Sequence, residues 1–332
     1  MKRHFLFVAL TVLLVMGTLI VGCKKDDPAN PDATYPVTAL VLNPQGDPQG
    51  GALLTLKNPP SNDPKFSAFT DAAGMATIQS PAGQQVLIAS IGSAFLAEIP
   101  VNVAANPAGT NAGTIRLAQN TTVRVLVIKA SAEQLETVLR IVGFSSYDST
   151  TINAMRDSAN VDSTRFLNFL KQYTLIFSNC HGGTEGGSAY ALLSRVYGRY
   201  IESGGKMYGG HYNYFHLQRI WSTFYTQFNN QGSPSTDTLK IIDANLSNFV
   251  GFSVASWATS LDSRRLSGYE KFSNLPTNAK VYGVIKNTSP EVGVIVENYV
   301  GTGKYLWTDY HNQDIRNSAT LVKLVQYFLL TM

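Results

Sequence analysis

Two glycine-rich turns gather the residues whose types suit them for chemistry. The first turn, residues 180–183, reads Cys-His-Gly-Gly and follows the apolar run 175–179. The second, residues 209–212, reads Gly-Gly-His-Tyr and follows the run 206–208. Short apolar runs bounded by such turns predict buried strands, and open α/β sheets bind ligands just outside the carboxyl ends of their strands. The sequence therefore predicts one cleft with a thiol and two imidazoles at its mouth.

Cys180 is one candidate catalytic residue, because a thiolate is a strong nucleophile and a neighbouring imidazolium favours the thiolate. His181 is the next residue, but adjacent residues of an extended segment point to opposite sides. His211 or His311 would therefore have to accept the proton from Cys180, and these two are the other candidates. The simpler interpretation, which we favour, is that Cys180 is a small buried apolar residue. No catalytic residue is assigned from the sequence.

A metal site is the second chemistry that these residues suggest. Three imidazoles, from His181, His211 and His311, would suit zinc, as would two of them with Glu185 or Asp309. None of these residues has the tight spacing that marks a metal-binding motif. We therefore expect no metal and no cofactor.

Aromatic residues are frequent around the same turns. Rings beside amide and imidazole groups bind sugars or peptides, although most aromatic side chains of a protein belong to its core. The predicted binding cleft consists of His181, Gly182, Gly183, His211, Tyr212, Trp307, His311 and Asn312.

The N-terminus predicts export and lipid attachment. Lys2 and Arg3 precede an apolar run over residues 5–21, which leads to Cys23. This order is typical of a secretory signal, and the ending Leu-Ile-Val-Gly-Cys resembles a bacterial lipobox, in which the cysteine is lipidated. The resemblance implies a signal peptide over 1–22 and a lipidated flexible tether over 23–35 that anchors the chain to a membrane. Because the Lys-Lys-Asp-Asp stretch after Cys23 resembles the export signal of Bacteroidetes surface lipoproteins, we expect an outer membrane lipoprotein of a Gram-negative bacterium, periplasmic or surface-exposed.

The charge balance argues against nucleic acid as a partner. The chain has 26 Lys and Arg against 22 Asp and Glu, a formal net charge of +4, and its basic residues form no cluster. Nucleic-acid-binding domains carry a basic patch or stripe. The expected partners are the membrane, through the lipid, and a glycan, a peptide or an envelope protein. With Cys23 committed to lipid, Cys180 is left without a cysteine for an intramolecular disulfide.

Residues 36–118 predict a small all-β sandwich. Short runs of alternating apolar and polar residues are separated by turns rich in Gly and Pro, which is the pattern of a sandwich. Asp71 and Gly74 suit a turn, since Asp caps its own turn and Gly accepts a positive φ. The Val-Thr-Ala-Leu-Val run and the Thr-Asp-Ala-Ala-Gly turn resemble a carboxypeptidase regulatory-like domain of the transthyretin-like type. That resemblance implies a spacer or binding module.

Residues 120–332 predict an α/β flavodoxin-like parallel-sheet domain. Strands and helices alternate, with a second strand expected at 141–144 and a helix expected to start at Asp162. The order of residues 173–180, 182–183, 204–208 and 303–312 resembles the class I glutamine amidotransferase-like fold, close to its trehalose-utilisation-type branch.

The resemblance implies a defective active site. In active amidotransferases a turn such as Gly182-Gly183 offers N–H groups to an oxyanion, and the elbow after the next strand presents a cysteine. Here His211 stands at that elbow, and His311 is followed by Asn312 and not by a carboxylate that would orient it. We therefore expect a non-catalytic binding lipoprotein. The alternatives are a hydrolase of unknown substrate using Cys180 or a histidine-bound metal, and a purely structural envelope component.

Overall fold

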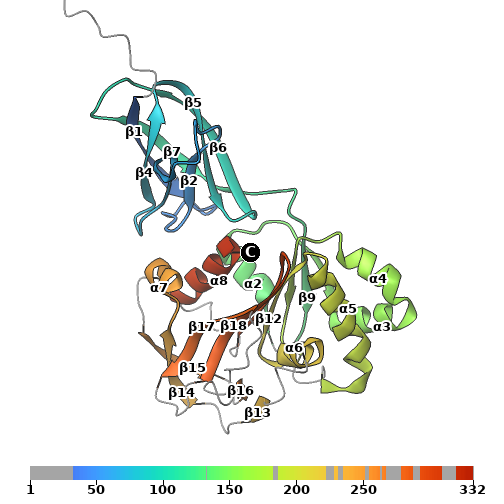
Figure 1. Cartoon of the computed structure of the whole chain (residues 1–332). Coiled ribbons are helices and arrows are strands. Elements are labelled where there is room, and N and C mark those ends of the chain that lie inside the picture. The colour runs from blue at the N-terminus through green and yellow to red at the C-terminus, as the bar shows by residue number, and fades with distance from the viewer. Residues whose placement is uncertain are drawn as a thin grey trace, which may run out of the picture.

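The computed structural model places an all-β part at one end of the molecule and an α/β part at the other (Figure 1). It describes residues 33–131, 133–181, 186–221, 228–230, 235–250, 254–261, 264–266, 278–286, 292–308 and 319–331. The predicted signal peptide, Cys23 and most of the tether lie outside the described residues. In the part of the chain that is described, no helix is long and apolar enough to cross a bilayer.

The all-β part consists of two sheets around an apolar core, which confirms the predicted sandwich. Val37, Ala39 and Val41 of β1 are fully buried and alternate with half-buried residues, because successive side chains of a strand point to opposite faces. One sheet has the order β4-β1-β7, and the other, which is antiparallel, has the order β3-β2-β5-β6-β8. The strands are β1 (Thr34–Leu42), β2 (Leu53–Leu56), β3 (Ser67–Phe69), β4 (Met75–Pro81), β5 (Gly83–Ile91), β6 (Phe95–Val103), β7 (Thr110–Arg116) and β8 (Ala118–Gln119).

The turn between β3 and β4 is held by its own side chains. Asp71 Oδ1 accepts the backbone N–H groups of Ala73 and Met75, each at 2.9 Å, as expected for an Asp in a turn. Gly74 has φ +76°, and a Cβ there would lie 2.6 Å from the carbonyl oxygen of Val41. Both residues thus have a sufficient structural role.

The α/β part is built on a nine-stranded mixed sheet, which confirms the predicted fold class. Its order is β10-β9-β11-β12-β19-β18-β17-β14-β15. The first five strands are parallel and follow the 2-1-3-4-5 order of flavodoxin-like sheets, whereas the last four extend the sheet in antiparallel fashion. The strands are β9 (Val125–Lys129), β10 (Asp148–Thr151), β11 (Leu175–Ser178), β12 (Lys206–Gly210), β14 (Ser235–Ile241), β15 (Val254–Leu261), β17 (Ala279–Lys286), β18 (Val292–Val300) and β19 (Gly303–Thr308), while β13 (Phe228–Asn230) and β16 (Arg264–Leu266) pair separately.

Helices cover both faces of this sheet, because its central strands are apolar on both sides. In β11, Phe177 packs into the core that includes α2 and α8, whereas Ile176 packs against α3, α4, α5 and α6. As predicted, a helix begins after Asp162, whose Oδ1 accepts the N–H groups of Thr164 and Arg165. The helices are α2 (Leu135–Val142), α3 (Ile152–Val161), α4 (Ser163–Leu170), α5 (Ala191–Glu202), α6 (Tyr214–Ile220), α7 (Ala244–Val250) and α8 (Ala319–Thr331).

The strand predicted at residues 141–144 is wrong. Leu139 and Val142 continue the buried face of α2, and Gly143 ends this helix in the left-handed region with φ 118°. The second strand is instead β10, a polar segment at the edge of the sheet. An edge strand needs no apolar run, so the apolar pattern does not reveal it.

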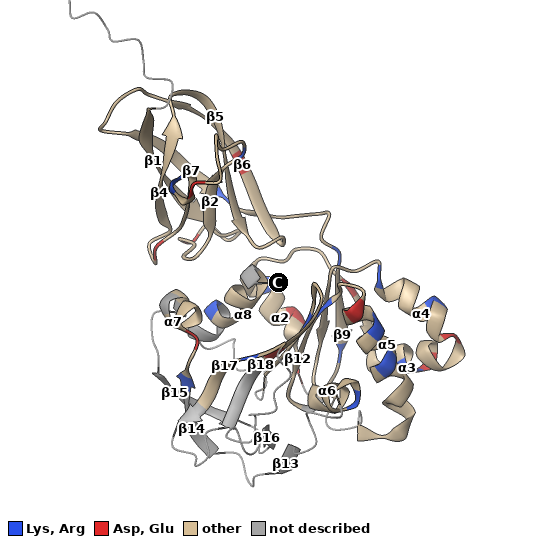
Figure 2. Ribbon diagram, in the orientation of Figure 1, with Lys and Arg blue, Asp and Glu red and all other residues tan. Residues whose placement is uncertain are grey.

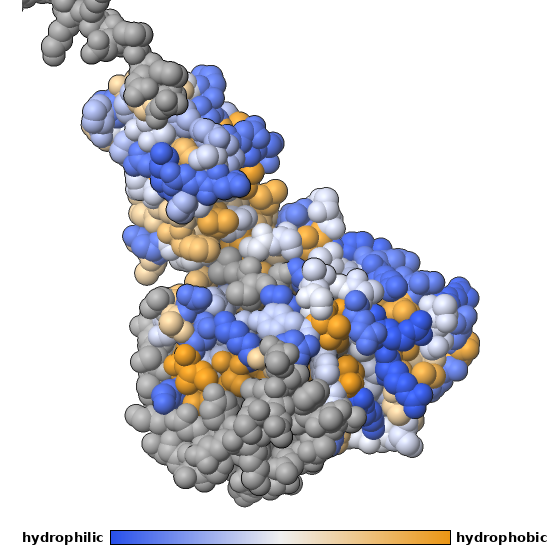
Figure 3. All heavy atoms as spheres, viewed as in Figure 1, coloured by the Kyte–Doolittle hydropathy of each residue, from blue (hydrophilic) through white to orange (hydrophobic). Residues whose placement is uncertain are grey.

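The two parts share one apolar core. The ring centroid of Phe95 in the sandwich lies 4.8 Å from that of Phe144. The Phe144 centroid in turn lies 6.3 Å from that of Phe177 in β11. Gln119 Oε1 also accepts the N–H of Ser145 at 2.8 Å. In the view of Figure 3, apolar residues gather at the end of the sandwich nearest the α/β part, whereas Figure 2 shows acidic and basic residues dispersed over both. The sandwich is therefore packed against the α/β domain and not merely linked to it.

Candidate functional site

The described residues of the two predicted turns, 180–181 and 209–212, lie side by side at the carboxyl edge of the sheet. β11 and β12 are parallel neighbours, with Ser178 opposite Gly209. Cys180 follows the first strand by two residues, and His211 follows the second strand directly. Since parallel strands end at the same edge, their following residues meet there.

His211 occupies a sharp elbow between β12 and α6. Its φ is 45°, and among the described residues it is the one non-glycine residue with positive φ. A non-glycine side chain in this region is strained. A hydrogen bond helps to fix the elbow, since Trp307 Nε1 donates to the carbonyl oxygen of His211 at 2.8 Å. Gly209 also contributes, because the absence of a Cβ leaves room for Tyr305 Oη and the Asn213 side chain.

The thiol of Cys180 contacts the imidazole of His211. Cys180 Sγ lies 3.1 Å from His211 Nδ1, and both side chains are fully buried. His181 instead directs Nε2 to the Lys129 carbonyl oxygen at 3.2 Å and is half-buried. The structure therefore brings His211, and not His181, to the thiol.

The loop after β9 supports Cys180 through residues that the sequence did not single out. Glu133, which is fully buried, accepts the Cys180 backbone N–H on Oε2 at 2.7 Å. Asn179 accepts the N–H of Leu135 on Oδ1 at 2.8 Å and donates from Nδ2 to Glu136 Oε2 at 2.9 Å. These bonds tie the end of β11 to the start of α2. Two features of the sequence could have indicated these bonds: an Asn at the end of a predicted strand, and an acidic residue just before a helix.

Asn213 ties the two strand ends to each other. Its Nδ2 lies 3.1 Å from the Ser178 oxygen, 3.2 Å from the Asn179 oxygen and 2.9 Å from the Gly210 oxygen. Its Oδ1 is buried and has no hydrogen-bond partner among the described residues. The amide nitrogen thus faces three carbonyl groups, which agrees with this orientation of the side chain. Asn213 directly follows the predicted turn 209–212, and the sequence predicted no role for it.

The remaining predicted residues are divided between described and undescribed parts of the chain. Gly182, Gly183, His311 and Asn312 lie outside the described residues, as do the alternative metal ligands Glu185 and Asp309. Tyr212 belongs to the turn after β12, but its side chain is not described. Trp307 is fully buried beneath the elbow.

His216 lies away from the strand ends. Its Nδ1 is 2.8 Å from Ser194 Oγ, which in turn donates to the Tyr190 carbonyl oxygen at 3.0 Å. Both His216 and Ser194 are fully buried where α5 meets α6. This pair therefore fixes one helix against another. Across the described ranges, no group of three or more His, Cys, Asp or Glu side chains is arranged to hold a metal ion.

The arrangement suits one chemical step and also impedes it. An imidazole nitrogen at hydrogen-bond distance from a thiol can accept its proton, which produces a thiolate nucleophile. A nucleophile must also reach its substrate, and Cys180 has no exposed surface. The site is thus a packed thiol–imidazole pair at the ligand-binding edge of the sheet.

The comparisons with known proteins show a distant likeness of fold. No protein-family model and no curated protein sequence matches the chain. Among solved structures, the chain is similar to the CTPS glutaminase domain of Trypanosoma brucei with bound acivicin (11% identity, 63% of this chain and 94% of that one, TM-score 0.39). It is also similar to a glutamine amidotransferase from Thermotoga maritima (14%, 64% and 94%, TM-score 0.35). A third similar structure is a 3-chlorocatechol 1,2-dioxygenase from Rhodococcus opacus, at 13% identity and a TM-score of 0.20. The match covers 26% of this chain and 60% of the dioxygenase chain. These likenesses concern the fold alone, and the flavodoxin-like description of the α/β domain rests on the sheet order given above.

Proposed function

We propose that the protein is a Gram-negative outer membrane lipoprotein, anchored by lipid on Cys23, whose amidotransferase-like domain binds a glycan, a peptide or a protein partner without turnover. In this proposal residues 36–118 are a carboxypeptidase regulatory-like spacer, and the α/β domain is of the trehalose-utilisation type. The proposal combines the resemblances found in the sequence into one role in the cell envelope.

One observation carries the non-catalytic part of this proposal. The elbow, which in nucleophile-elbow enzymes exposes the attacking side chain, here holds a fully buried imidazole. The His211 ring faces Cys180 Sγ and its carbonyl oxygen accepts from Trp307. Both the side chain and the backbone of His211 thus serve internal contacts, which supports a site that has become part of the packing.

A turnover assay tests this conclusion. The full-length protein, purified in a polyoxyethylene detergent, is incubated with glutamine, with release of ammonia as the readout, and with p-nitrophenyl acetate. We expect the wild type, Cys180→Ala and the remote surface control Val161→Ala to give the same background rate. A wild-type rate that is lost in Cys180→Ala and kept in Val161→Ala would refute the non-catalytic proposal.

The contact between Cys180 and His211 favours a second candidate function, a thiol hydrolase. His211 Nδ1 would take the proton of Cys180 Sγ, and the thiolate would attack an acyl carbon. The leaving group would depart with the proton from His211, and water would then hydrolyse the thioester to the free acid and restore the thiol. The nucleophile would then stand just after β11 and its base at the elbow after β12. Alkylation by iodoacetamide tests access to the thiol: modification of the folded wild type, absent in Cys180→Ala and slowed in His211→Gln, supports the hydrolase.

A histidine-bound metal is the other form of the hydrolase. Elemental analysis of the purified protein, beside His211→Ala, tests it directly. Stoichiometric metal in the wild type that is lost in the variant supports a metallohydrolase, and metal-free protein with unchanged turnover in chelator argues against it.

The anchor is tested separately from the domain. Labelling of cells with radioactive palmitate should mark the wild type and not Cys23→Ser. Protease treatment of intact cells then distinguishes the two expected locations, since only a surface-exposed protein is cleaved. Label in the Cys23→Ser variant would contradict lipid attachment at this cysteine.

A further inference from the structure

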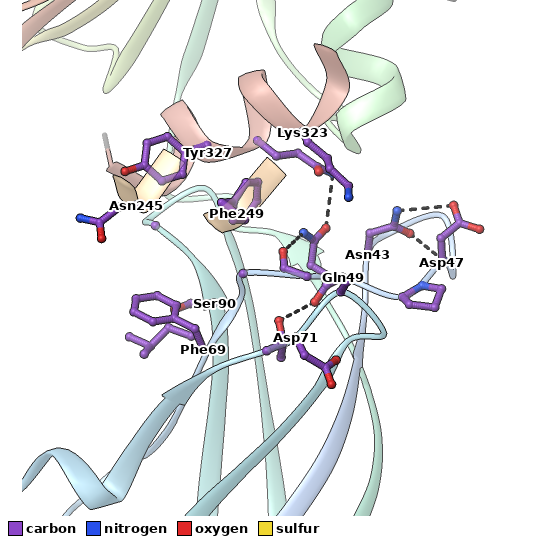
Figure 4. A pocket seen from close by; sticks show the side chains of 18 of the residues that line it. Asn43, Asp47, Gln49, Phe69, Asp71, Ser90, Asn245, Phe249, Lys323 and Tyr327 are labelled. Atoms are coloured by element: carbon purple, nitrogen blue, oxygen red, sulfur yellow. Dashed lines mark hydrogen bonds between the residues drawn. The ribbon is translucent and has the colours of Figure 1, made fainter. Parts of the chain in front are cut away.

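A cavity of about 1000 Å³ lies between the sandwich and the α/β domain (Figure 4), and neither Cys180 nor His211 lines it. Its sandwich wall comes from the loop before β2, the end of β3 and the turn that follows. Its other wall comes from α7 and α8. This volume is at the upper end of small-molecule sites in proteins, so the cavity has room for a ligand of several rings.

The sandwich wall is fixed before any ligand arrives. Thr70 Oγ1 donates to the Gln49 carbonyl oxygen at 2.6 Å and accepts the Ala52 N–H at 2.9 Å. Gln326 of α8 donates from Nε2 to Gln49 Oε1 at 3.3 Å, which links the two walls. With Asp71 Oδ1 committed to its own turn, the wall has little freedom to lose on binding, and this favours affinity.

Aromatic rings contribute to both walls. Phe69 at the end of β3 is 69% exposed, which is unusual for a phenylalanine side chain. Phe249 of α7 packs on Gly51, where no Cβ would fit, and its ring centroid lies 5.5 Å from that of Tyr327 in α8. An exposed ring at the mouth of a cavity is costly in water and offers a flat apolar face to a ligand.

The polar groups of the cavity are mostly uncharged. The charged lining residues are two carboxylates, Asp47 and Asp71, and one ammonium, Lys323, which forms no ion pair with any described residue. The other polar lining residues are amides and hydroxyls, including Asn245, whose side chain makes no hydrogen bond within the described chain. A phosphate or nucleotide site would need concentrated positive charge, and this cavity lacks it.

We propose that this junction cavity binds a short neutral oligosaccharide. The apolar C–H faces of sugar rings would lie on Phe69 and Phe249, and their hydroxyl groups would exchange hydrogen bonds with Asn245, Asp71 and Lys323. A bound peptide would need hydrogen-bond partners for its backbone N–H and C=O groups. The short edge strand β3, of three residues, offers few backbone groups to pair with them. The proposal goes beyond the function proposed for the strand-end site, because the cavity is lined by residues of the sandwich and of the helices facing it and by neither Cys180 nor His211.

Calorimetric titration of the full-length protein tests this proposal. The probes are maltohexaose, cellohexaose, xylohexaose and a β-1,3-glucan hexaose, with a mixture of tetrapeptides as the competing class. We expect one of the hexaoses to bind, Phe69→Ala and Asn245→Ala each to weaken it by about tenfold or more, and Val161→Ala to leave it unchanged. Val161 is the matched control, since it is 87% exposed and lies on α3.

Three results overturn the proposal: no hexaose binds, a hexaose binds equally well to Phe69→Ala and Asn245→Ala, or only the peptides bind. Both test residues are exposed, and melting temperatures equal to that of the wild type show that a lost signal is not lost folding. Titration of Cys180→Ala separates the sites, because binding at the junction should persist in that variant. Hexaose binding that disappears in Cys180→Ala and persists in Phe69→Ala would assign the ligand to the strand ends and refute the junction site.

Discussion

The left-handed conformation of His211 predicts an unusual order of stability between two variants. His211→Ala and His211→Gly both remove the imidazole and its contact with Cys180, and both keep the carbonyl oxygen to which Trp307 donates. Alanine keeps the strain of positive φ, which costs an L-residue about 1–2 kcal/mol. Glycine removes that strain, although its freedom in the unfolded chain costs about 0.5–1 kcal/mol. We therefore expect His211→Gly to be more stable than His211→Ala by roughly 0.5–1 kcal/mol.

Ser158 provides the matched control. It is exposed in the middle of α3, where residues have ordinary helical conformation. There the order should be reversed, with Ser158→Ala more stable than Ser158→Gly by about 1 kcal/mol. The opposite signs at the two positions separate the effect of positive φ from the general cost of glycine.

Urea unfolding, followed by tryptophan fluorescence, measures both differences. All three tryptophans lie at or after Trp221, so the signal reports the α/β domain. The four variants are compared through their midpoints at a common slope. A His211→Ala variant as stable as His211→Gly, or more stable, would refute the left-handed elbow and with it the comparison to a nucleophile elbow.

Three further predictions concern stability. Burial raises the pKa of Asp243, but the hydrogen bond and charge of Lys280, together with hydrogen bonds from the Leu246 N–H and the Tyr327 hydroxyl, outweigh burial and lower that pKa. This contribution to stability is therefore present above about pH 4 and is lost as the pH falls through the depressed folded pKa. The urea midpoint of the wild type should accordingly drop more between neutral and acidic pH than that of Asp243→Asn. Asn213→Ala should cost about 3 kcal/mol in urea unfolding, because carbonyl groups at two strand ends lose their donor in the core, and a loss below about 1 kcal/mol would contradict the bridging role. Gly51→Ala should lower stability by about 2 kcal/mol, since Gly51 has φ +72° and lies against the Phe249 ring; in a double-mutant cycle with Phe249→Ala the loss should shrink, and simple additivity would argue against this contact.

The sequence determined the local structure and the order of the elements. Alternating residues predicted β1, the capping residue Asp162 predicted the start of α4, and the apolar run before Cys180 predicted β11. Each of these signals lies within a few neighbouring residues, because strand alternation and helix caps depend on local geometry. The order of strands and helices then favoured the flavodoxin-like sheet, and with it the edge at which Cys180 and His211 lie.

Local patterns failed at two segments. β10 is polar because it lies at the edge of the sheet, and Ile141 and Val142, which were assigned to a second strand, belong to the end of α2. Burial of an element depends on which neighbours cover it, and that information is not present in the segment itself.

Tertiary structure alone decided which groups meet. Cys180 and His211 are 31 residues apart, and Glu133 and Cys180 are 47 apart, so their contacts follow from the register of β9, β11 and β12 and not from any local motif. The junction cavity brings Phe69 of the sandwich to Phe249 of the α/β domain in the same way. Secondary structure arises from hydrogen bonds and periodicity that a short segment contains, whereas a site requires the packing of the whole chain to place side chains within a few ångströms of each other.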